Sequence, residues 1–284
     1  MTTAIYTRNC ELKPGMVFPD TMRRIAVGIE YNGSNFNGFQ KQRTSATTIQ
    51  AALETALSQV ADETITTVCA GRTDARVHAT GQVAHFDTDA QRPLKAWQLG
   101  GNSHLPDQIR ITWCREVGPQ FHARFCALSR TYRYVISSAP VRSAILLDQV
   151  TWTCYPLDVD KMQRAASDLV GQRDFSSFRS VQCQASSPVR TVETAKVFYD
   201  RSLLVLEITA NGFLHHMVRN IAGVLMAVGR GEKPVTWIQE LLQVKDRTKA
   251  GVTAPPYGLY LVAVRYPDHF ELPQIPKGPV FLDG

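Results

Sequence analysis

The densest group of polar residues in the chain is the segment Ala70-Gly-Arg-Thr-Asp-Ala-Arg-Val-His-Ala79. Arg72 and Asp74 stand two residues apart in it, so both side chains can point the same way from an extended segment. A carboxylate that a nearby cation keeps charged can act as a nucleophile or as a base. Taken alone, however, a bare Arg-x-Asp favours a plainer structure, a solvated loop in which Asp74 caps a turn.

Arg219 is the second residue that could take part in chemistry, because it interrupts the apolar segment 213–228, where Asn220 is its only near polar neighbour. Two placements fit this pattern. Arg219 can lie on a solvent-facing stripe of a helix together with His215 and Met226, or it can be a buried cation. A buried cation needs a partner, since breaking a buried ion pair by removing one member costs about 3–5 kcal/mol.

The remaining candidates favour packing over metal chemistry. Tyr132 alternates with Tyr134 and Ile136 on one face of an expected strand, which is typical of a sheet core. His215 and His216 are adjacent, and neighbouring helical positions point about 100° apart, so the pair is not expected to share a metal ion. The six cysteines, which form no C-x-x-C pair and are expected to be reduced thiols of a cytoplasmic protein, are Cys10, Cys69, Cys114, Cys126, Cys154 and Cys183.

The elements that must position these residues occur as two copies of one pattern. In the first copy, alternation predicts strands and helical spacing predicts helices, with Thr47 or Thr48 as the N-cap of the first helix. The expected elements are a strand at 24–31, a helix at 48–60, strands at 64–70 and 82–88, a helix from about Pro93, and a strand at 109–117.

The second copy repeats this order and adds one short helix. The expected elements are a strand at 132–137, a helix at 159–170 that ends at Gly171, a hairpin of strands at 189–199 and 203–210, helices at 213–228 and 235–244, and a strand at 259–266.

Each copy has the order β-α-β-β-α-β, which predicts an α+β fold of two ferredoxin-like halves. The halves are expected to join into one mixed, mainly antiparallel sheet, with helices packed on one side and an open cleft between the halves. The predicted domains are residues 22–118, which carry the Asp74 loop, and residues 119–268. Residues 1–21 and 269–284 are expected to be flexible tails.

Composition narrows the partners only slightly. The chain has a net charge of +6 and a pI near 9.1, which weakly favours an anionic partner. No apolar stretch approaches the roughly 18–20 residues that a membrane span needs, and no secretory signal is visible at the N-terminus. A cytoplasmic protein without membrane association is therefore expected.

The segment 71–88, GRTDARVHATGQVAHFDT, closely resembles the signature G-R-T-D-x-G-V-H-A of the TruA family of pseudouridine synthases. The resemblance runs from about residue 22 to residue 267 in the family's order. Its further segments are FNGFQKQ at 36–42, ARF at 123–125, RTYRY at 130–134, DFSSF at 174–178, SPVRT at 187–191, NGFLHHMVRNIAG at 211–223 and GLYLVAVRYP at 258–267.

The resemblance implies an isomerase that converts uridine to pseudouridine in tRNA. Because this reaction adds and removes nothing, it requires no cofactor and no metal. By resemblance, Asp74 is the catalytic nucleophile or base, and Arg219 pairs with it. Tyr132 stacks on the target base, and Arg72 contacts the phosphate backbone or orients Asp74.

The resemblance also implies the substrate and the assembly. Family members modify positions 38, 39 and 40 in the anticodon stem-loop of tRNA and work as homodimers that hold each tRNA across both subunits. The basic residues that would fit an RNA groove in the cleft are Arg23, Arg24, Lys41, Arg43, Arg124, Arg130, Arg133, Arg179 and Arg190.

Two alternatives keep the resemblance and change the function. One is a non-catalytic RNA-binding or RNA-folding module with the same cleft, and the other is a synthase for another RNA. Retention of Asp74, Tyr132 and Arg219 together argues against the first. One residue departs from the family pattern: Arg76 stands where the family has glycine, and it strains the loop if that position has a positive φ.

Overall fold

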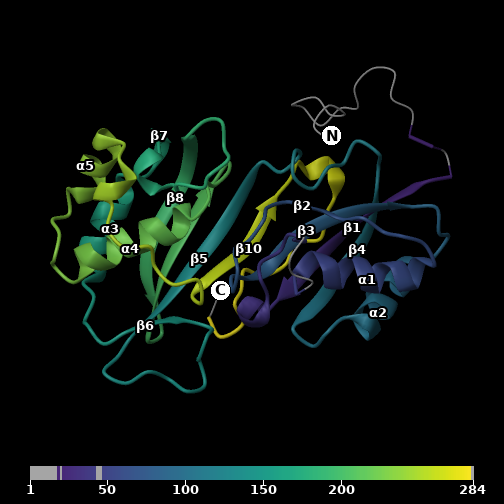
Figure 1. Ribbon diagram of the computed structural model, residues 1–284, viewed down its shortest axis with the longest axis horizontal. Helices are drawn as coiled ribbons and strands as arrows, with labels where there is room; N and C mark the ends of the chain where they lie inside the picture. The colour runs from purple at the N-terminus through teal and green to yellow at the C-terminus, as the bar shows by residue number, and fades with distance from the viewer. Residues whose placement is uncertain (1–17, 20, 43–46, 283–284) are drawn as a thin grey trace. The chain divides into compact units, whose positions relative to one another are not determined.

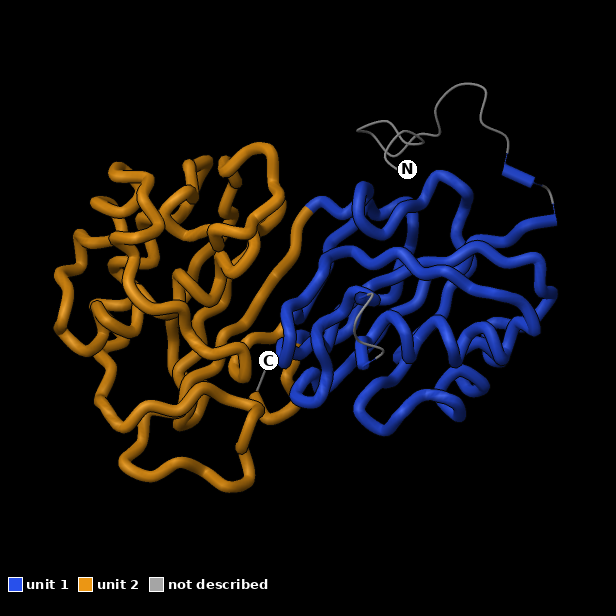
Figure 2. The backbone as a smooth tube through the Cα atoms, viewed as in Figure 1, with its two compact units in different colours: residues 1–128, 261–277 blue, residues 129–260, 278–284 orange. Residues whose placement is uncertain are grey.

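The computed structural model describes residues 18–19, 21–42 and 47–282. It divides into two compact units, residues 1–128 with 261–277 and residues 129–260 with 278–284 (Figure 2). Relative to the domain ranges drawn from the sequence, the segments 119–128 and 261–268 fall in the first unit. The chain therefore leaves the first unit after residue 128, returns to it at residue 261 and leaves it again after residue 277.

The first unit has the expected element order β-α-β-β-α-β (Figure 1). Its strands neighbour one another in the order β4-β1-β3-β2, and every neighbouring pair is antiparallel. This pairing is that of the split β-α-β arrangement, so the α+β prediction is confirmed. The elements are β1 (Arg23–Tyr31), η1 (Gly33–Asn35), α1 (Ile49–Ala61), β2 (Val68–Cys69), β3 (His78–Thr88), α2 (Leu94–His104) and β4 (Ile109–Val117).

The sheet of the first unit is buried on both faces. Ile25 and Phe86 are register partners on one face, where Trp97 of α2 packs edge-on against Phe86 with the ring centroids 5.1 Å apart. Successive residues of a strand point to opposite faces, so Ala26 lies on the other face. There it belongs to a second apolar cluster with Phe121.

The C-terminal segment completes this second cluster. Phe270, only 6% exposed, is part of it, and Leu272 and Ile275 pack against it. Phe270 also lies edge-on to Phe121, with the ring centroids 5.1 Å apart. The first part of the segment 269–284, which the sequence predicts to be a flexible tail, thus covers one face of the first unit's sheet.

The second unit repeats the pairing of the first. Its strands neighbour one another in the order β5-β9-β8-β7, all antiparallel, and β6 lies parallel to β5. The run β5-β9-β8 corresponds to β1-β3-β2, which confirms the internal repeat. The elements are β5 (Ser129–Ser138), β6 (Thr151–Thr153), α3 (Val159–Ser167), β7 (Gly171–Asp174), η2 (Ser176–Phe178), β8 (Val189–Asp200), β9 (Leu203–Ala210), α4 (Met217–Gly229), α5 (Trp237–Val244) and η3 (Arg247–Lys249).

The last elements of the chain are β10 (Leu259–Arg265) and η4 (Asp268–Phe270). β10 begins in the second unit, where Val135 N donates to Gly258 O at 2.8 Å. It continues in the first unit, where a Cβ added to Gly81 of β3 would lie 2.2 Å from Val262 O. Glycine at position 81 is therefore required for β3 and β10 to approach this closely.

One predicted helix begins later than expected. Apolar spacing predicts a helix over 213–228, but α4 begins at Met217 because His216 has φ +63°. A residue in the left-handed region cannot continue a right-handed helix. Residues 213–216 are consequently part of the loop that follows β9.

Two chemical expectations can be compared with the described residues. The thiols of Cys69, Cys114, Cys154 and Cys183 are free, as expected. The expectation is wrong for Cys126, which is disulfide-bonded, and Cys10 lies outside the described residues. Among the helices that the structure describes, none is long and apolar enough to cross a membrane.

Candidate active site

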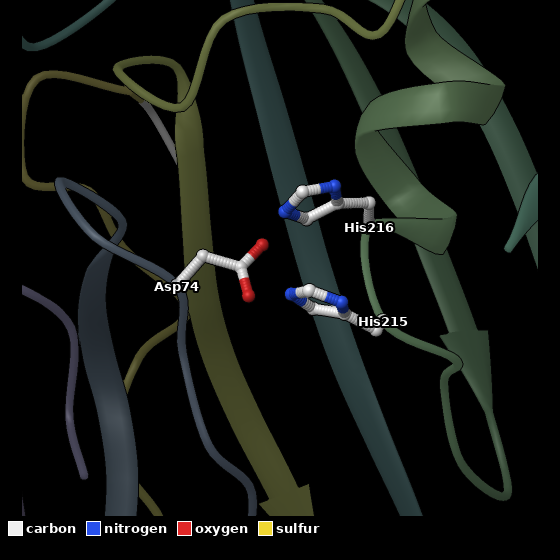
Figure 3. A group of neighbouring side chains, drawn as sticks. All are labelled: Asp74, His215 and His216. Carbon is white, nitrogen blue, oxygen red and sulfur yellow. The ribbon is translucent and has the colours of Figure 1, made fainter. Parts of the chain in front are cut away.

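Asp74 lies in the loop between β2 and β3, at the first position of a tight turn (Figure 3). Its carbonyl oxygen accepts a hydrogen bond from Val77 N at 3.2 Å, and within the turn only the third residue, Arg76, has a positive φ, of 65°. This pattern is that of a type II turn, which favours glycine at the third position. The glycine of the family signature is thus replaced by arginine at a position with positive φ.

The segment 36–39 holds this turn through its backbone. Phe39 N donates to Thr73 O, and Arg76 N donates to Phe36 O, both at 3.1 Å. Gly38 has φ +88°, and a Cβ there would lie 2.8 Å from Thr73 O. The segment FNGF therefore positions the Asp74 loop, and no side chain larger than that of glycine fits at Gly38.

Side chains of strands β1 and β3 also form hydrogen bonds with the Asp74 loop. The hydroxyl of Tyr31 shares a 2.8 Å hydrogen bond with that of Thr73, and Gln82 Nε2 donates to Gly71 O at 2.7 Å. Thr73 is buried, Asp74 half-buried and Arg72 exposed. The backbone of the loop is thus fixed on a rigid sheet, which leaves its charged side chains at the surface.

Arg219 lies in α4 and is half-buried. Its Nε donates to Ala254 O at 2.9 Å, and Ala254 N donates to Arg219 O at 3.1 Å, so the side chain is fixed to the segment before β10. Met226 is only 8% exposed. The prediction that Arg219 and Met226 share a solvent-facing stripe of the helix is therefore wrong.

A buried tyrosine stands close to the Arg219 charge. Tyr134 is 0% exposed, and its hydroxyl contacts Thr151 Oγ1 at 2.6 Å and Pro255 O at 2.8 Å. Burial raises the pKa of Tyr134 well above its ordinary value, and the Arg219 charge acts in the opposite direction. Tyr134 is therefore a core residue with its hydroxyl satisfied, as alternation predicts.

Tyr132 lies two residues earlier on β5 and is 8% exposed. Its ring is in edge contact with Phe213, with the centroids 5.0 Å apart and the planes at 81°. The orientation of the Tyr132 ring is thus fixed by the loop between β9 and α4.

His215 and His216 lie side by side in that loop, with their ring centroids 4.0 Å apart (Figure 3). The argument from helical spacing is therefore wrong for this pair, because neither residue lies within α4. His215 O accepts from Ser180 N at 2.9 Å, which links the loop to the segment after η2.

Two arginines assigned to the RNA groove from the sequence are structural. Arg24 is 6% exposed, pairs with Asp87 at 2.6 Å and donates to Phe121 O at 2.8 Å. Arg133 is 4% exposed and pairs with Glu207 at 2.9 Å. Neither guanidinium can reach a phosphate without breaking a buried ion pair.

Of the other basic residues in that set, Arg43 lies outside the described residues, and Arg124 is exposed. Sequence reasoning missed the residues that hold the loop, chiefly Tyr31, Gly38 and Gln82. Alternation identifies Tyr31 and Gln82 as strand residues but gives no sign of their loop contacts. Among the site residues, Arg72 and Asp74 belong to the first unit, Tyr132 and Arg219 to the second, and the Asp74–Arg219 pair stays a prediction.

The sequence matches the family described as tRNA pseudouridine synthase over residues 28–126 and 165–267. Among curated relatives, tRNA pseudouridine synthase A of Pseudomonas aeruginosa is 56% identical over 261 residues, which cover 92% of each chain. The protein of the same name in Alcanivorax borkumensis is 53% identical over 92% of this chain and 98% of its own. A solved Cbf5-Nop10-Gar1 complex matches 71% of this chain and 45% of that chain with a TM-score of 0.30 and 13% identity, too distant to carry an argument. The chain therefore belongs to the tRNA pseudouridine synthase family.

Proposed function

We propose that this chain isomerises uridine to pseudouridine in tRNA and that the carboxylate of Asp74 is its catalytic group. The observation that carries the proposal is the geometry of the Asp74 turn. The Thr73 side chain is hydrogen-bonded to β1, and the backbone around Asp74 is hydrogen-bonded to β3 and the segment 36–39. Asp74 is half-buried, and Arg72 and Arg76, two positions away on either side in the sequence, are exposed. A carboxylate on a rigidly held turn, with basic residues two positions away on either side in the sequence, suits attack or proton abstraction on a polyanionic substrate.

The reaction defines what this carboxylate must do. The bond from C1′ to N1 of uracil breaks, the base turns, and C1′ joins C5. The proton that leaves C5 is balanced by one gained at N1, so no electron acceptor or other reactant is needed. An ionised carboxylate at the junction of sugar and base serves as the nucleophile or the base.

Arg219 is proposed to pair with Asp74 and to keep its carboxylate charged while the RNA excludes water. Two observations support this role. The Nε bond to Ala254 O fixes the plane of the guanidinium, and the residue is half-buried, where charges interact more strongly than in water.

Tyr132 is proposed to stack on the target uracil once the base has left the RNA helix. The edge contact with Phe213 supports this role, because it keeps the Tyr132 ring in one orientation. Arg72 is proposed to contact a phosphate beside the target nucleotide or to orient Asp74, since it is exposed and only two residues away.

The target is proposed to be uridine at positions 38, 39 and 40 of the anticodon stem-loop, in the cytoplasm. The test is to incubate the protein with unmodified tRNA and to map pseudouridine at single-nucleotide resolution. Product at these positions supports the proposal. Product only at other uridines would change the target and keep the chemistry, whereas binding without product in any candidate RNA would favour the non-catalytic module.

The chain is also proposed to form a homodimer. The segment around β6 exposes several apolar side chains, which a second copy would remove from water. They are Val141 (80% exposed), Ile145 (85%), Leu147 (51%) and Tyr155 (60%). Light scattering should give twice the 31.6 kDa chain mass, and Ile145→Asp should give the single mass. A wild-type monomer at micromolar concentration would contradict the dimer.

A further inference from the structure

The loop between β4 and β5 presents an exposed aromatic ring on a buried support. Phe121, Ala123 and Cys126 are at most 1% exposed, whereas Arg124 is exposed and Phe125 is 38% exposed. The loop closes on itself through Cys126 N, which donates to His122 O at 3.0 Å. Single exposed apolar residues are common, so exposure alone gives Phe125 no role.

What distinguishes Phe125 is the way its backbone and its ring are held. His122 Nδ1 accepts from both Arg124 N and Phe125 N at 3.1 Å, and His85 Nδ1 accepts from Ala123 N at 3.2 Å. Three consecutive amides are thus bound by two buried imidazoles. The phenyl ring of Phe125 stacks on the His122 ring, with the centroids 4.3 Å apart and the planes at 24°.

Phe125 stays 38% exposed beside this stacking contact. The guanidinium carbon of Arg124 lies 5.7 Å from the centroid of the Phe125 ring, so a cation accompanies the aromatic surface. An exposed aromatic ring with an adjacent arginine is the usual surface on which proteins stack unpaired bases and hold their phosphates.

The loop also lies beside the catalytic loop within the first unit. Burial raises the pKa of the Cys69 thiol to about 11, and the charges of Arg72 and Arg124 both act to lower it. Ala70, which follows β2 four residues before Asp74, belongs to the same buried cluster as Ala123 and Cys126, so the two loops pack on one core.

We propose that Phe125 and Arg124 form a subsite that binds an unpaired nucleotide next to the target uridine. The base stacks on the exposed part of the Phe125 ring, and its phosphate pairs with Arg124. His122 is a positioning residue that fixes the phenyl ring and the loop amides. The inference rests on the proposed function, because it assigns a further subsite for the same RNA.

The test compares Phe125→Leu, which keeps apolar bulk, with Phe125→Trp, which keeps an aromatic face. Stacking of one base predicts that Phe125→Leu weakens tRNA binding at least about fivefold at constant salt, with an unchanged salt slope, and that Phe125→Trp restores it. Arg124→Gln should also weaken binding and reduce the salt slope by about 0.7–0.9. Leu99→Ala is the matched control, since Leu99 is 57% exposed on α2, and it should bind normally.

Binding within twofold of wild type for a folded Phe125→Leu variant would overturn the proposal. An equal loss in Phe125→Trp would also overturn it, because that result means a packing role. Thermal unfolding confirms that each variant folds. Pseudouridine formation by the wild type is measured in parallel: its absence would refute the proposed function, while the binding comparison still decides the role of Phe125.

Discussion

At the scale of single residues, Arg76 occupies a backbone position that glycine would fill without strain. Its φ is +65°, and the left-handed region costs an L-residue about 1–2 kcal/mol. The side chain is exposed two residues from Asp74, where it can contact phosphate. Arg76 therefore combines a cost in stability with a positive charge two residues from Asp74 in the sequence.

Arg76→Gly should stabilise the fold by about 0.5–1 kcal/mol, because relief of the left-handed strain exceeds the added entropy of glycine in the unfolded chain. It should also weaken tRNA binding modestly and lower the salt slope. Denaturant unfolding and binding at several salt concentrations check both effects. Arg201→Gly, at φ +52° in the β8–β9 turn, is the matched control and should gain stability with unchanged binding. A large rise in turnover for Arg76→Gly would show instead that Arg76 impairs the enzyme.

Arg219→Lys should lower turnover by at least about a hundredfold. A lysine keeps the positive charge, but it cannot donate to Ala254 O and present a planar fork at the same time. Steady-state kinetics with unmodified tRNA measure the effect. Arg230→Lys, at the end of the same helix where Arg230 pairs with the exposed Glu232, should leave turnover unchanged. Near-normal turnover in a folded Arg219→Lys variant would contradict the Asp74–Arg219 pair.

At the scale of elements, the β4–β5 loop depends on neutral histidines. Burial, and then the charges of Arg24 and Arg124, lower the pKa of His122 to about 4, while Asp87 acts weakly the other way. Burial, Arg24 and His122 lower the pKa of His85 well below its ordinary value. Each Nδ1 must be unprotonated to accept the loop amides, so protonation removes the support of Phe125.

This arrangement makes the fold sensitive to acid. Below pH 6.5 the unfolded chain takes up protons on these histidines while the folded chain does not, so stability falls as pH falls from 6.5 through about 4. The loss is up to about 1.4 kcal/mol per pH unit for each histidine. His122→Gln should be less stable at pH 7 and should show a shallower loss between pH 6.5 and 4.5. Parallel curves of unfolding free energy against pH for the two proteins would contradict the role of His122.

The bounds of the helices and strands show which elements the sequence predicts and which it misses. The apolar pattern predicts β4 and β9 with their observed bounds, because β4 alternates and β9 is a short, almost continuous apolar run after the turn at 200–202. It misses β6 and β7, which are three and four residues long. It also extends α4 by four residues, since apolar spacing carries no sign that His216 has a left-handed backbone.

At the scale of the whole molecule, the duplicated β-α-β-β-α-β order is visible in the sequence because each copy repeats the same periodicities. The return of residues 261–277 to the first unit cannot be predicted from the sequence, because it depends on long-range packing of Phe270 and Tyr266 on Phe121. The same holds for the site: the motif identifies Asp74, but the hydrogen bonds that hold its loop join β1, β3 and the segment 36–39 across the sequence.

The most direct measurement of the central claim is the activity of Asp74→Asn. The change is nearly isosteric, and the turn is kept because the bond from Val77 N goes to the backbone oxygen of residue 74. The amide supplies neither a nucleophile nor a base, and one negative charge is removed from an RNA-binding site. With tRNA labelled with tritium at C5 of uridine, wild type should release tritium and form pseudouridine. Asp74→Asn should bind the tRNA as tightly or more tightly and release none above background. Conversion by Asp74→Asn at a rate comparable to that of the wild type would contradict the account.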